Sequence, residues 1–277
     1  MNSFANKIVV ITGAGAGMGR SLAFQLASLG AKLAICDVNA EGLAETARLC
    51  QARGVEIEAR VVNVAEWEEV LQFANQLRER FGLVHYVFNN AGIGYFNTVE
   101  KSELKDFERI MDVDFWGVVH GTKAFLALLE ASGDGHLVNT SSIFGLFAVP
   151  SHSAYNAAKF AVRGFTEALR QELLIANKPI TVTCVHPGFI RTDIGKNSTG
   201  VDGALPGDLI ALFDRIAITS ADSAARKILK AARSGSAKAL IGPDAIVLDA
   251  LVRLLGHRYQ RPLAKLVAKF APAGSFT

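Results

Sequence analysis

Tyr155 and Lys159 are the two residues of this sequence whose types and spacing are best suited to moving a proton. Residues four apart on a helix lie on the same face, so the lysine ammonium is expected near the phenol. A nearby positive charge favours the phenolate and lowers the pKa of a tyrosine. A tyrosine tuned in this way can donate a proton to a developing alkoxide or remove one from an alcohol. The spacing alone is also that of an ordinary pair on a helix surface.

Two serines precede this pair at a useful distance. Ser141 and Ser142 follow the apolar segment Leu137–Thr140 and lie 14 and 13 residues before Tyr155. The carboxyl end of a parallel strand and the start of the next helix meet at the sheet edge where ligands bind in such folds. A serine hydroxyl there can donate a hydrogen bond to a substrate oxygen and share its charge in the transition state.

A glycine-rich turn follows the first apolar segment, Lys7–Thr12. Gly13, Gly17 and Gly19 form the pattern T-G-x-x-x-G-x-G, and Gly15 lies between them. Glycine permits positive φ angles and lets backbone N–H groups approach a pyrophosphate closely. A helix that begins there adds free N–H donors and partial positive charge. The turn predicts a dinucleotide site, although a tight strand-to-helix turn without a ligand has the same pattern.

Asp37 ends the second apolar segment, 24 residues after Gly13. In dinucleotide folds a carboxylate at this place accepts hydrogen bonds from the adenosine ribose and repels a 2′-phosphate. The next residue, Val38, is not a base that could hold that phosphate. Asp37 therefore favours NAD, with NADP the less favoured cofactor. Arg20, close to the glycine turn, is the contrary indication, and we favour a solvated helix residue as its interpretation.

The elements that must position these residues alternate between short apolar strands and longer helices. Such alternation indicates parallel pairing with helices on both faces, and we expect a single α/β domain over residues 1–277, a Rossmann-type doubly wound sheet of about seven strands. The expected strands are Lys7–Thr12, Lys32–Asp37, Glu56–Val62, Val84–Phe88, His136–Thr140, Ile180–Val185 and Ala239–Ile241, and the expected helices include Met18–Leu29, Ala40–Arg53, Glu66–Phe81, Glu103–Glu130 and Tyr155–Ile175.

Two segments after the sixth strand differ from this pattern. Residues 188–208 have the composition of a long loop, and we expect a substrate lid at 193–215. Residues 243–277 form a helical C-terminal extension with apolar residues at helical spacing. The extension is basic and amphipathic, which is typical of weak contact with an anionic membrane surface. Packing on the domain or on a partner subunit is the competing interpretation.

The charge of the chain is concentrated in this extension. The net charge is +3, and residues 250–277 contribute five basic residues and no acid, which leaves 24 basic and 26 acidic residues elsewhere. A body of that balance argues against nucleic-acid binding. The three cysteines form no metal-ligand spacing, so we expect no metal site and a reducing, cytoplasmic location. We find neither a signal peptide nor an apolar run long enough to span a membrane.

These motifs together resemble the short-chain dehydrogenase/reductase family over about residues 5–195. The matching residues are the glycines of Thr12–Gly19, the segment Asn89–Gly92, the set Ser142, Tyr155 and Lys159, and the segment Pro187–Thr192. The resemblance implies an NAD-dependent oxidoreductase that interconverts an alcohol and its ketone. It also implies a homodimer or homotetramer built through the two long helices.

The resemblance also implies roles for individual residues. Tyr155 is the expected general acid/base, Lys159 lowers its pKa and holds the nicotinamide ribose, and Ser142 polarises the carbonyl. The backbone of Ile190 and the side chain of Thr192 are expected to contact the carboxamide. The full set of expected cofactor contacts is Gly13, Gly15, Gly17, Met18, Gly19, Asp37, Asn63, Val64, Asn90, Ala91, Gly92, Tyr155, Lys159, Pro187, Gly188, Ile190 and Thr192.

Two residues depart from the family pattern. Asp114 stands where the family usually has an asparagine that anchors a water beside the lysine; we include it in the catalytic set and expect reduced or pH-shifted activity. An aspartate cannot donate an amide N–H, and if ionised near Lys159 it would favour the ammonium. Asn63 stands where the family commonly has an aspartate that contacts adenine, and an asparagine still accepts a hydrogen bond.

The substrate itself is expected to be hydrophobic. Phe144 and Phe189 should line the site with Ser142 and Tyr155, and no fixed cation is available for a carboxylate or phosphate. We expect an alicyclic, aromatic or steroid-like secondary alcohol, and a loop-exposed His152. Further candidates for the pocket are Gly94, Tyr95, Phe96, Phe147, Val149, Leu205, Leu209 and Phe213.

Three alternatives stay open at this point. The first is an NADP-dependent carbonyl reductase of the same fold, against which Asp37 argues. The second is a catalytically impaired dinucleotide-binding regulator or scaffold, which Asp114 alone supports. The third is an epimerase or dehydratase, for which the chain has no second substrate domain.

Overall fold

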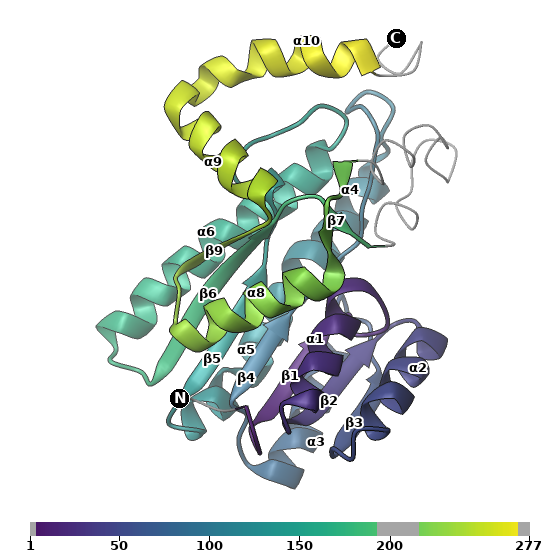
Figure 1. Cartoon of the computed structure of the whole chain (residues 1–277), viewed down its shortest axis with the longest axis vertical. Coiled ribbons are helices and arrows are strands. Elements are labelled where there is room, and N and C mark those ends of the chain that lie inside the picture. Colours follow the sequence, from purple (N-terminus) through teal and green to yellow (C-terminus); the bar gives the residue numbers. More distant parts are fainter. Residues whose placement is uncertain (1–3, 193–215, 271–277) are drawn as a thin grey trace.

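The computed structural model describes residues 4–192 and 216–270 (Figure 1). Its centre is a seven-stranded sheet in the order β3-β2-β1-β4-β5-β6-β9, with every neighbouring pair parallel. The strands are β1 (Ile8–Thr12), β2 (Lys32–Asp37), β3 (Ile57–Val61), β4 (Tyr86–Asn89), β5 (Gly135–Thr140), β6 (Ile180–Pro187) and β9 (Lys238–Ile241). The order runs outward in both directions from β1, which confirms the predicted doubly wound α/β sheet.

Helices cover both faces of this sheet because successive strand side chains point to opposite faces. Val9 and Ile11 of β1 pack in one cluster with α1 (Gly17–Ser28), α2 (Ala40–Gln51) and α8 (Ala221–Ser234). Val10, between them, packs in a second cluster with the helices of the other face, α3 (Trp67–Phe81), α5 (Gly117–Ala131) and α6 (Ser153–Ile175). A strand buried on both faces explains why the strands read as continuous apolar runs.

The helix predicted over Glu103–Glu130 is divided in the structure. It consists of α4 (Leu104–Met111), a π-helical segment (Asp112–Trp116) and α5. A π segment adds a residue to one turn, and such segments occur frequently at functional sites. Asp114 lies within it and is fully buried, so the irregular turn delivers this carboxyl group to the interior.

The chain beyond β6 forms two smaller features. β7 (Ile190–Arg191) pairs with β8 (Thr219–Ser220) in parallel. α9 (Pro243–Leu255), a 3₁₀ turn (Gly256–Tyr259) and α10 (Gln260–Phe270) form an arm at the end of the molecule away from α3 (Figure 1). The predicted lid at 193–215 and residues 271–277 lie outside the described residues. None of the helices in the described part of the chain has the length and apolar character needed to cross a membrane.

Candidate active site

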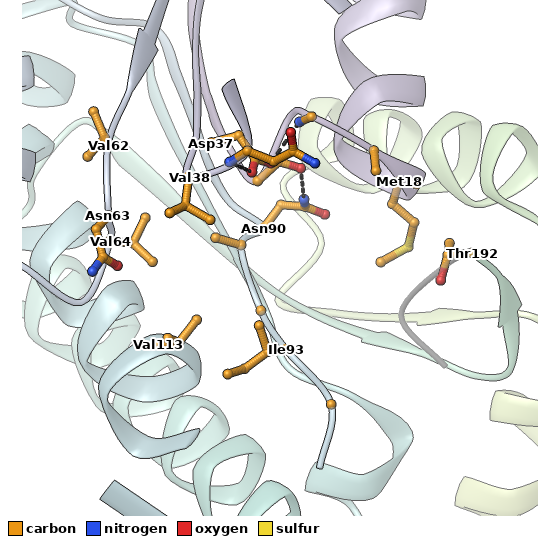
Figure 2. A pocket seen from close by; sticks show the side chains of 18 residues that line it. Met18, Asp37, Val38, Val62, Asn63, Val64, Asn90, Ile93, Val113 and Thr192 are labelled. Atoms are coloured by element: carbon orange, nitrogen blue, oxygen red, sulfur yellow. Dashed lines mark hydrogen bonds between the residues drawn. The ribbon is translucent and has the colours of Figure 1, made fainter. Parts of the chain in front are cut away.

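A pocket of about 320 Å³ lies along the carboxyl ends of the strands (Figure 2). Its walls come from the segments that follow β1, β2, β3 and β4, which end side by side in the sheet. It is also lined by Val113 of the π segment and by Thr192, which follows β7. The predicted cofactor residues in its lining are Gly13, Gly15, Gly17, Met18, Asp37, Asn63, Val64, Asn90, Ala91, Gly92 and Thr192.

The glycine turn is close-packed as well as open to the pocket. Gly13 has φ +66°, and a Cβ there would lie 2.6 Å from the Cα of Ala91. α1 begins at Gly17 with no side-chain cap from Ala16 and no acidic residue in its first turn. Its first N–H groups therefore keep the partial positive charge that suits a pyrophosphate.

Asp37 and Arg20 fix this turn from two sides. The Asp37 carboxylate accepts hydrogen bonds from the backbone N–H groups of Gly15 and Asn39, each at 2.8 Å. A carboxylate has about four acceptor positions, so two remain for ribose hydroxyls. The Arg20 guanidinium donates to Thr46 Oγ1 at 2.9 Å and to the carbonyl of Gly15. The interpretation of Arg20 as a solvated residue is wrong, because it ties the glycine turn to α2.

The segment after β4 connects this turn to the middle of the sheet. The Thr12 hydroxyl accepts hydrogen bonds from the N–H groups of Asn90 and Ala91, both at 3.0 Å. The Asn90 amide donates to the carbonyls of Thr12 and Gly13 at 3.1 and 3.2 Å. Asn63 has its side-chain oxygen engaged with the N–H of Ala65, at 3.1 Å. Asn90 therefore supports the glycine turn through side chain and backbone together.

Tyr155 and Lys159 lie on one face of the first turns of α6, as their spacing predicts. The Lys159 Nζ is 5.5 Å from the centre of the Tyr155 ring. It forms an ion pair with Asp114 Oδ2 at 3.0 Å and donates to the carbonyl of Thr140 at 3.2 Å. The lysine and aspartate side chains are 4% and 0% exposed. The interpretation of Tyr155 and Lys159 as an ordinary pair on a helix surface is therefore excluded, because the lysine is a buried cation with a buried counter-ion.

Ser142 follows β5 and faces the same tyrosine. The Ser142 oxygen accepts from the N–H of Phe144 at 3.1 Å, and the Ser142 hydroxyl is near enough to the Tyr155 phenol to lower the pKa of that phenol. The neighbouring Ser141 instead donates to the carbonyl of Lys159 at 2.8 Å. The structure thus places Ser142 at the phenol and uses Ser141 to attach β5 to α6.

The pKa of the tyrosine differs from the sequence expectation. Burial raises the pKa of Tyr155, Lys159 lowers it, the Asp114 carboxylate raises it and the Ser142 hydrogen bond lowers it, and the net direction is upward. Burial also opposes a charged Lys159, but the charges of Asp114 and Tyr155 outweigh that effect, and the pKa of Lys159 is raised. The sequence predicted a lowered tyrosine pKa because it did not show the burial or the contact with Asp114.

The ion pair adjoins the dinucleotide pocket through Gly92 and Ile93. The Ile93 N–H donates to Asp114 Oδ1 at 2.8 Å. A Cβ on Gly92 would lie 3.3 Å from the Lys159 Nζ, and both Gly92 and Ile93 line the pocket. Ile93 also packs in one hydrophobic cluster with Tyr155. The pocket and the proton-handling residues are therefore parts of one site.

Aromatic side chains form the other wall beside Tyr155. The Phe144 ring meets the rings of Tyr155, Phe147 and Phe189 edge to face, with centroids 5.8–6.3 Å apart. His152 also meets Phe144, at 5.3 Å. The expectation of a loop-exposed His152 is wrong: its ring is packed among aromatics, and burial lowers its pKa to about 4. Leu205, Leu209 and Phe213 lie outside the described residues.

The segment from Pro187 to Thr192 passes between this wall and the glycine turn. Thr192 reaches the turn, since a Cβ on Gly17 would lie 3.3 Å from the Thr192 side chain. The N–H of Phe189 donates to Asp244 Oδ2 at 2.6 Å. Gly188 packs directly against the same carboxyl group, which leaves no room for a Cβ. Asp244 thus fixes the segment expected to hold the carboxamide. No sequence motif marked it, although a carboxylate in the first turn of a helix is a common anchor.

Known proteins share both the sequence and this arrangement. A family model described as short chain dehydrogenase matches residues 7–201. This chain belongs to the short-chain dehydrogenase family. A Mycobacterium tuberculosis protein named as an oxidoreductase, SadH, is 55% identical over 273 residues, 98% of this chain and 99% of the relative. A cyclohexanol dehydrogenase of Acinetobacter sp. is 37% identical over 194 residues, 70% of this chain and 76% of the relative.

A solved structure extends the match to three dimensions. A short-chain dehydrogenase/reductase from Burkholderia phymatum in complex with NAD has a TM-score of 0.85 and 30% identity, with 95% of this chain and 98% of that chain covered. The chain is accordingly an oxidoreductase of the short-chain dehydrogenase family, whose members bind a nicotinamide dinucleotide and act on CH–OH groups.

In this short-chain dehydrogenase the sequence did not point to one histidine that lies beside the candidate catalytic residue Ser142. His186 is fully buried on β6, and its Nδ1 lies 3.0 Å from the carbonyl oxygen of Ser142. A carbonyl only accepts, so Nδ1 carries the proton, and burial lowers the pKa of His186 to about 4. The contact could not be predicted from the sequence, because 44 residues separate Ser142 and His186.

Removing this donor is expected to weaken the placement of Ser142. His186→Leu should lower kcat about tenfold, since an unpaired buried carbonyl costs about 1–3 kcal/mol and the backbone shifts to avoid it. His186→Asn carries an amide near the Nδ1 position and should recover most of the loss. Steady-state kinetics of both variants, with the melting temperature as a fold check, test this. Equal losses in the two variants would contradict a positioning role.

Proposed function

We propose that the protein is an NAD-dependent oxidoreductase that interconverts a hydrophobic secondary alcohol and its ketone, with Tyr155 as the general acid/base. The observation that carries the proposal is the junction at Gly92 and Ile93. It joins the pocket that contains the glycine turn and Asp37 to the group of Tyr155, Ser142 and Lys159. The NAD complex of the related structure and the cyclohexanol dehydrogenase among the relatives support it.

The residues of the pocket fit the parts of a dinucleotide. The free N–H groups at Gly17–Gly19 suit the pyrophosphate, Asp37 suits the adenosine ribose, and Asn63 and Val64 suit the adenine. Lys159 would hold the nicotinamide ribose, and Pro187, Gly188, Ile190 and Thr192 would surround the carboxamide. Accepting or supplying a hydride is the chemistry that a bound nicotinamide contributes.

The protein's own residues handle the proton and the oxygen. In alcohol oxidation the Tyr155 phenolate removes the hydroxyl proton while Ser142 donates a hydrogen bond to the oxygen that becomes the carbonyl. In ketone reduction the phenol returns the proton. Lys159 stabilises the phenolate by its charge, and Asp114 keeps the lysine protonated. Phe144 and Phe189 exclude water from the reacting carbon and suit an apolar substrate.

Asp37 is expected to decide the choice of cofactor. Asp37→Ser should weaken NAD binding about tenfold or more, because it removes a charged acceptor, and should strengthen NADP binding because the repulsion of the 2′-phosphate disappears. Asp37→Asn keeps an acceptor for the Gly15 N–H and separates charge from turn geometry. Titration of the two cofactors by protein fluorescence measures both effects, with the exposed Glu41→Gln as a control. Unchanged preference in Asp37→Ser would remove Asp37 from this role.

The reaction itself is tested by following nicotinamide absorbance with NAD or NADP across hydrophobic secondary alcohols, with short carboxylated alcohols as the control. We expect turnover with NAD and the apolar alcohols. Turnover only with NADP would support the proposed reaction but contradict the proposed cofactor. The alternative of an NADP-dependent carbonyl reductase would then hold. Turnover only with the carboxylated alcohols would contradict the apolar substrate.

One observation favours a second candidate function. The buried contact of Asp114 with Lys159 uses the lysine that the nicotinamide ribose would otherwise engage. A dinucleotide-binding regulator with impaired turnover is consistent with that contact. Measurable NAD binding with no turnover on any alcohol of the panel would favour it.

The proposal also covers the oligomeric state of the protein and its location in the cell. We propose a homodimer or homotetramer in which the long helices α5 and α6 pair, since Trp116 and Phe160 are exposed beside them. We also propose a cytoplasmic location, in keeping with Cys36, Cys50 and Cys184 being free and buried.

A further inference from the structure

The C-terminal arm contains a helix with two apolar faces. One face of α9 packs on the body: Leu248 and Val252 join Phe144, Phe147 and other residues in a single hydrophobic cluster. Tyr259 and Leu263 extend this contact beyond α9. The Tyr259 hydroxyl accepts a hydrogen bond from the N–H of Ala148 at 3.0 Å, and its ring meets Phe147 edge to face. The arm is therefore anchored on the aromatic wall of the candidate active site.

The opposite face of α9 is apolar and exposed. Its large side chains are Ile246, Val247, Leu251 and Leu254, with exposed fractions of 55%, 63%, 46% and 84%. Ala250 lies among them and is also exposed. At 3.6 residues per turn these positions form one continuous stripe. A contiguous exposed stripe of this kind marks a surface that contacts another apolar phase or partner.

A row of basic residues comes after this stripe in the sequence. Arg261, Lys265 and Lys269 lie four residues apart along one exposed face of α10, and Arg258 lies in the turn before it. Within residues 4–192 and 216–270 none of these four cations forms an ion pair. No acidic residue follows Asp249 in the sequence. The outer surface of the arm thus combines exposed apolar side chains with basic side chains that have no acidic partner in the described part of the chain.

We propose that the outer face of the arm docks on an anionic lipid surface. Exposed leucines beside a row of basic residues suit the interface of a bilayer, where apolar side chains enter the acyl boundary and cations meet the headgroups. A protein partner would need acidic groups arranged to match the cation row. For contact with a second copy of this chain, the exposed aromatics Trp116 and Phe160 beside α5 and α6 are the better candidates. The arm lies on the surface of the bilayer, because no described helix is able to span it.

Docking through this face would bring the candidate active site close to the lipid, because the inner face of the same helix packs on Phe144 and Phe147. An apolar alcohol dissolved in the bilayer then has a short path to the site. This consequence rests on the proposed function, whereas the docking itself does not.

Co-sedimentation with vesicles tests the docking on the full chain. Wild-type protein should bind vesicles of equal parts phosphatidylglycerol and phosphatidylcholine, and should bind phosphatidylcholine alone far more weakly. Lys265→Glu with Lys269→Glu should weaken partition at least about 30-fold, since each basic residue near an anionic surface contributes about fivefold. Leu251→Ser with Leu254→Ser should weaken it at least about tenfold through lost apolar burial.

Matched controls distinguish vesicle binding through the arm from general electrostatic attraction and from loss of folding. Lys227→Glu with Lys230→Glu makes the same charge change on exposed positions of α8 and should leave partition within about twofold, since these charges do not face the lipid. The readout is independent of catalysis, so failure of the proposed reaction leaves the test intact. Point variants are preferred to truncation, because Tyr259 and Leu263 belong to the inner contact.

Three outcomes would overturn the docking proposal. One is absence of binding to the anionic vesicles. Another is an equal loss of binding in the α8 control and the α10 variant, which would indicate diffuse attraction. The third is a fall in molecular mass of the Leu251/Leu254 variant in sedimentation velocity, which would assign the stripe to a second copy of the chain.

Discussion

Tyr155→Phe is expected to lower kcat by about 10²- to 10⁴-fold, the usual contribution of a positioned general acid or base. The phenylalanine keeps the ring that packs against Phe144 but has no hydroxyl to exchange a proton with the substrate oxygen or to bond to Ser142. NAD affinity should change little, because Tyr155 is not among the residues that line the pocket of the glycine turn and Asp37. Single-turnover and steady-state rates of alcohol oxidation, together with an NAD titration, measure both quantities.

Tyr95→Phe is the matched control for this change. Tyr95 is a buried tyrosine in the hydrophobic cluster against which Tyr155 packs, but its hydroxyl donates to Asp106 at 2.8 Å. The control should keep kcat within a few-fold. Full turnover in Tyr155→Phe would remove the tyrosine from proton transfer. An equal loss in both variants would show that the effect is structural.

Asp114→Leu is expected to destabilise the protein by about 3–5 kcal/mol, because it leaves the Lys159 ammonium buried without a counter-ion. The same change also removes the acceptor of the Ile93 N–H. Chemical denaturation measures the free energy of unfolding. Asp112→Leu, in the same π segment but exposed, should change it by less than about 0.5 kcal/mol. Equal small effects at the two positions would show that the ion pair contributes nothing to stability.

Asp114→Asn separates the charge from the hydrogen bonds. Asp114 contacts Ile93 and Lys159 through different oxygens, so the single amide oxygen of asparagine can still accept from one of these two donors. The fold should therefore persist, but the negative charge near Tyr155 disappears. Oxidation needs the phenolate, so its rate rises as pH increases through the pKa of Tyr155. Because Asp114 raises that pKa, the variant should show the rising limb at lower pH. A pH–rate profile identical to that of the wild type would mean that Tyr155 does not sense the carboxylate.

Comparison of Asp114→Asn with the wild type also distinguishes the candidate functions. If Asp114→Asn gains turnover at neutral pH, the aspartate tunes a working enzyme towards alkaline conditions. If both the wild type and this variant bind NAD and neither turns over any alcohol, the regulator is the better description.

Several features of the candidate site could be predicted from the sequence, because each depends on local sequence. They are the glycine turn, Asp37, and the spacing of Ser142, Tyr155 and Lys159. A turn needs glycine where φ is positive, and residues four apart on a helix share a face whatever surrounds them. Alternating strands and helices likewise predicted a doubly wound parallel sheet of about seven strands with helices on both faces, which the structure confirms.

The sequence could not predict features that depend on contacts between distant segments. Asp114 and Lys159 are far apart in the chain and meet only because a π-helical turn carries the carboxyl group inward beside α6. The sequence predicts a solvated Arg20, because its partners Thr46 and Gly42 lie on α2 and come near it only in the folded chain. His186 becomes buried, and the His152 ring packs against Phe144, through contacts that no local pattern records.

The same division applies to the chemistry. The sequence alone determined which groups can move a proton and where a dinucleotide can bind, since residue type and periodicity specify those possibilities. The tertiary structure decided the protonation of those groups, because a pKa depends on burial and on charges brought near by folding. It also decided that one face of α9 faces the active-site wall and the other faces solvent, because an amphipathic pattern shows that a helix has faces and only packing shows what covers them.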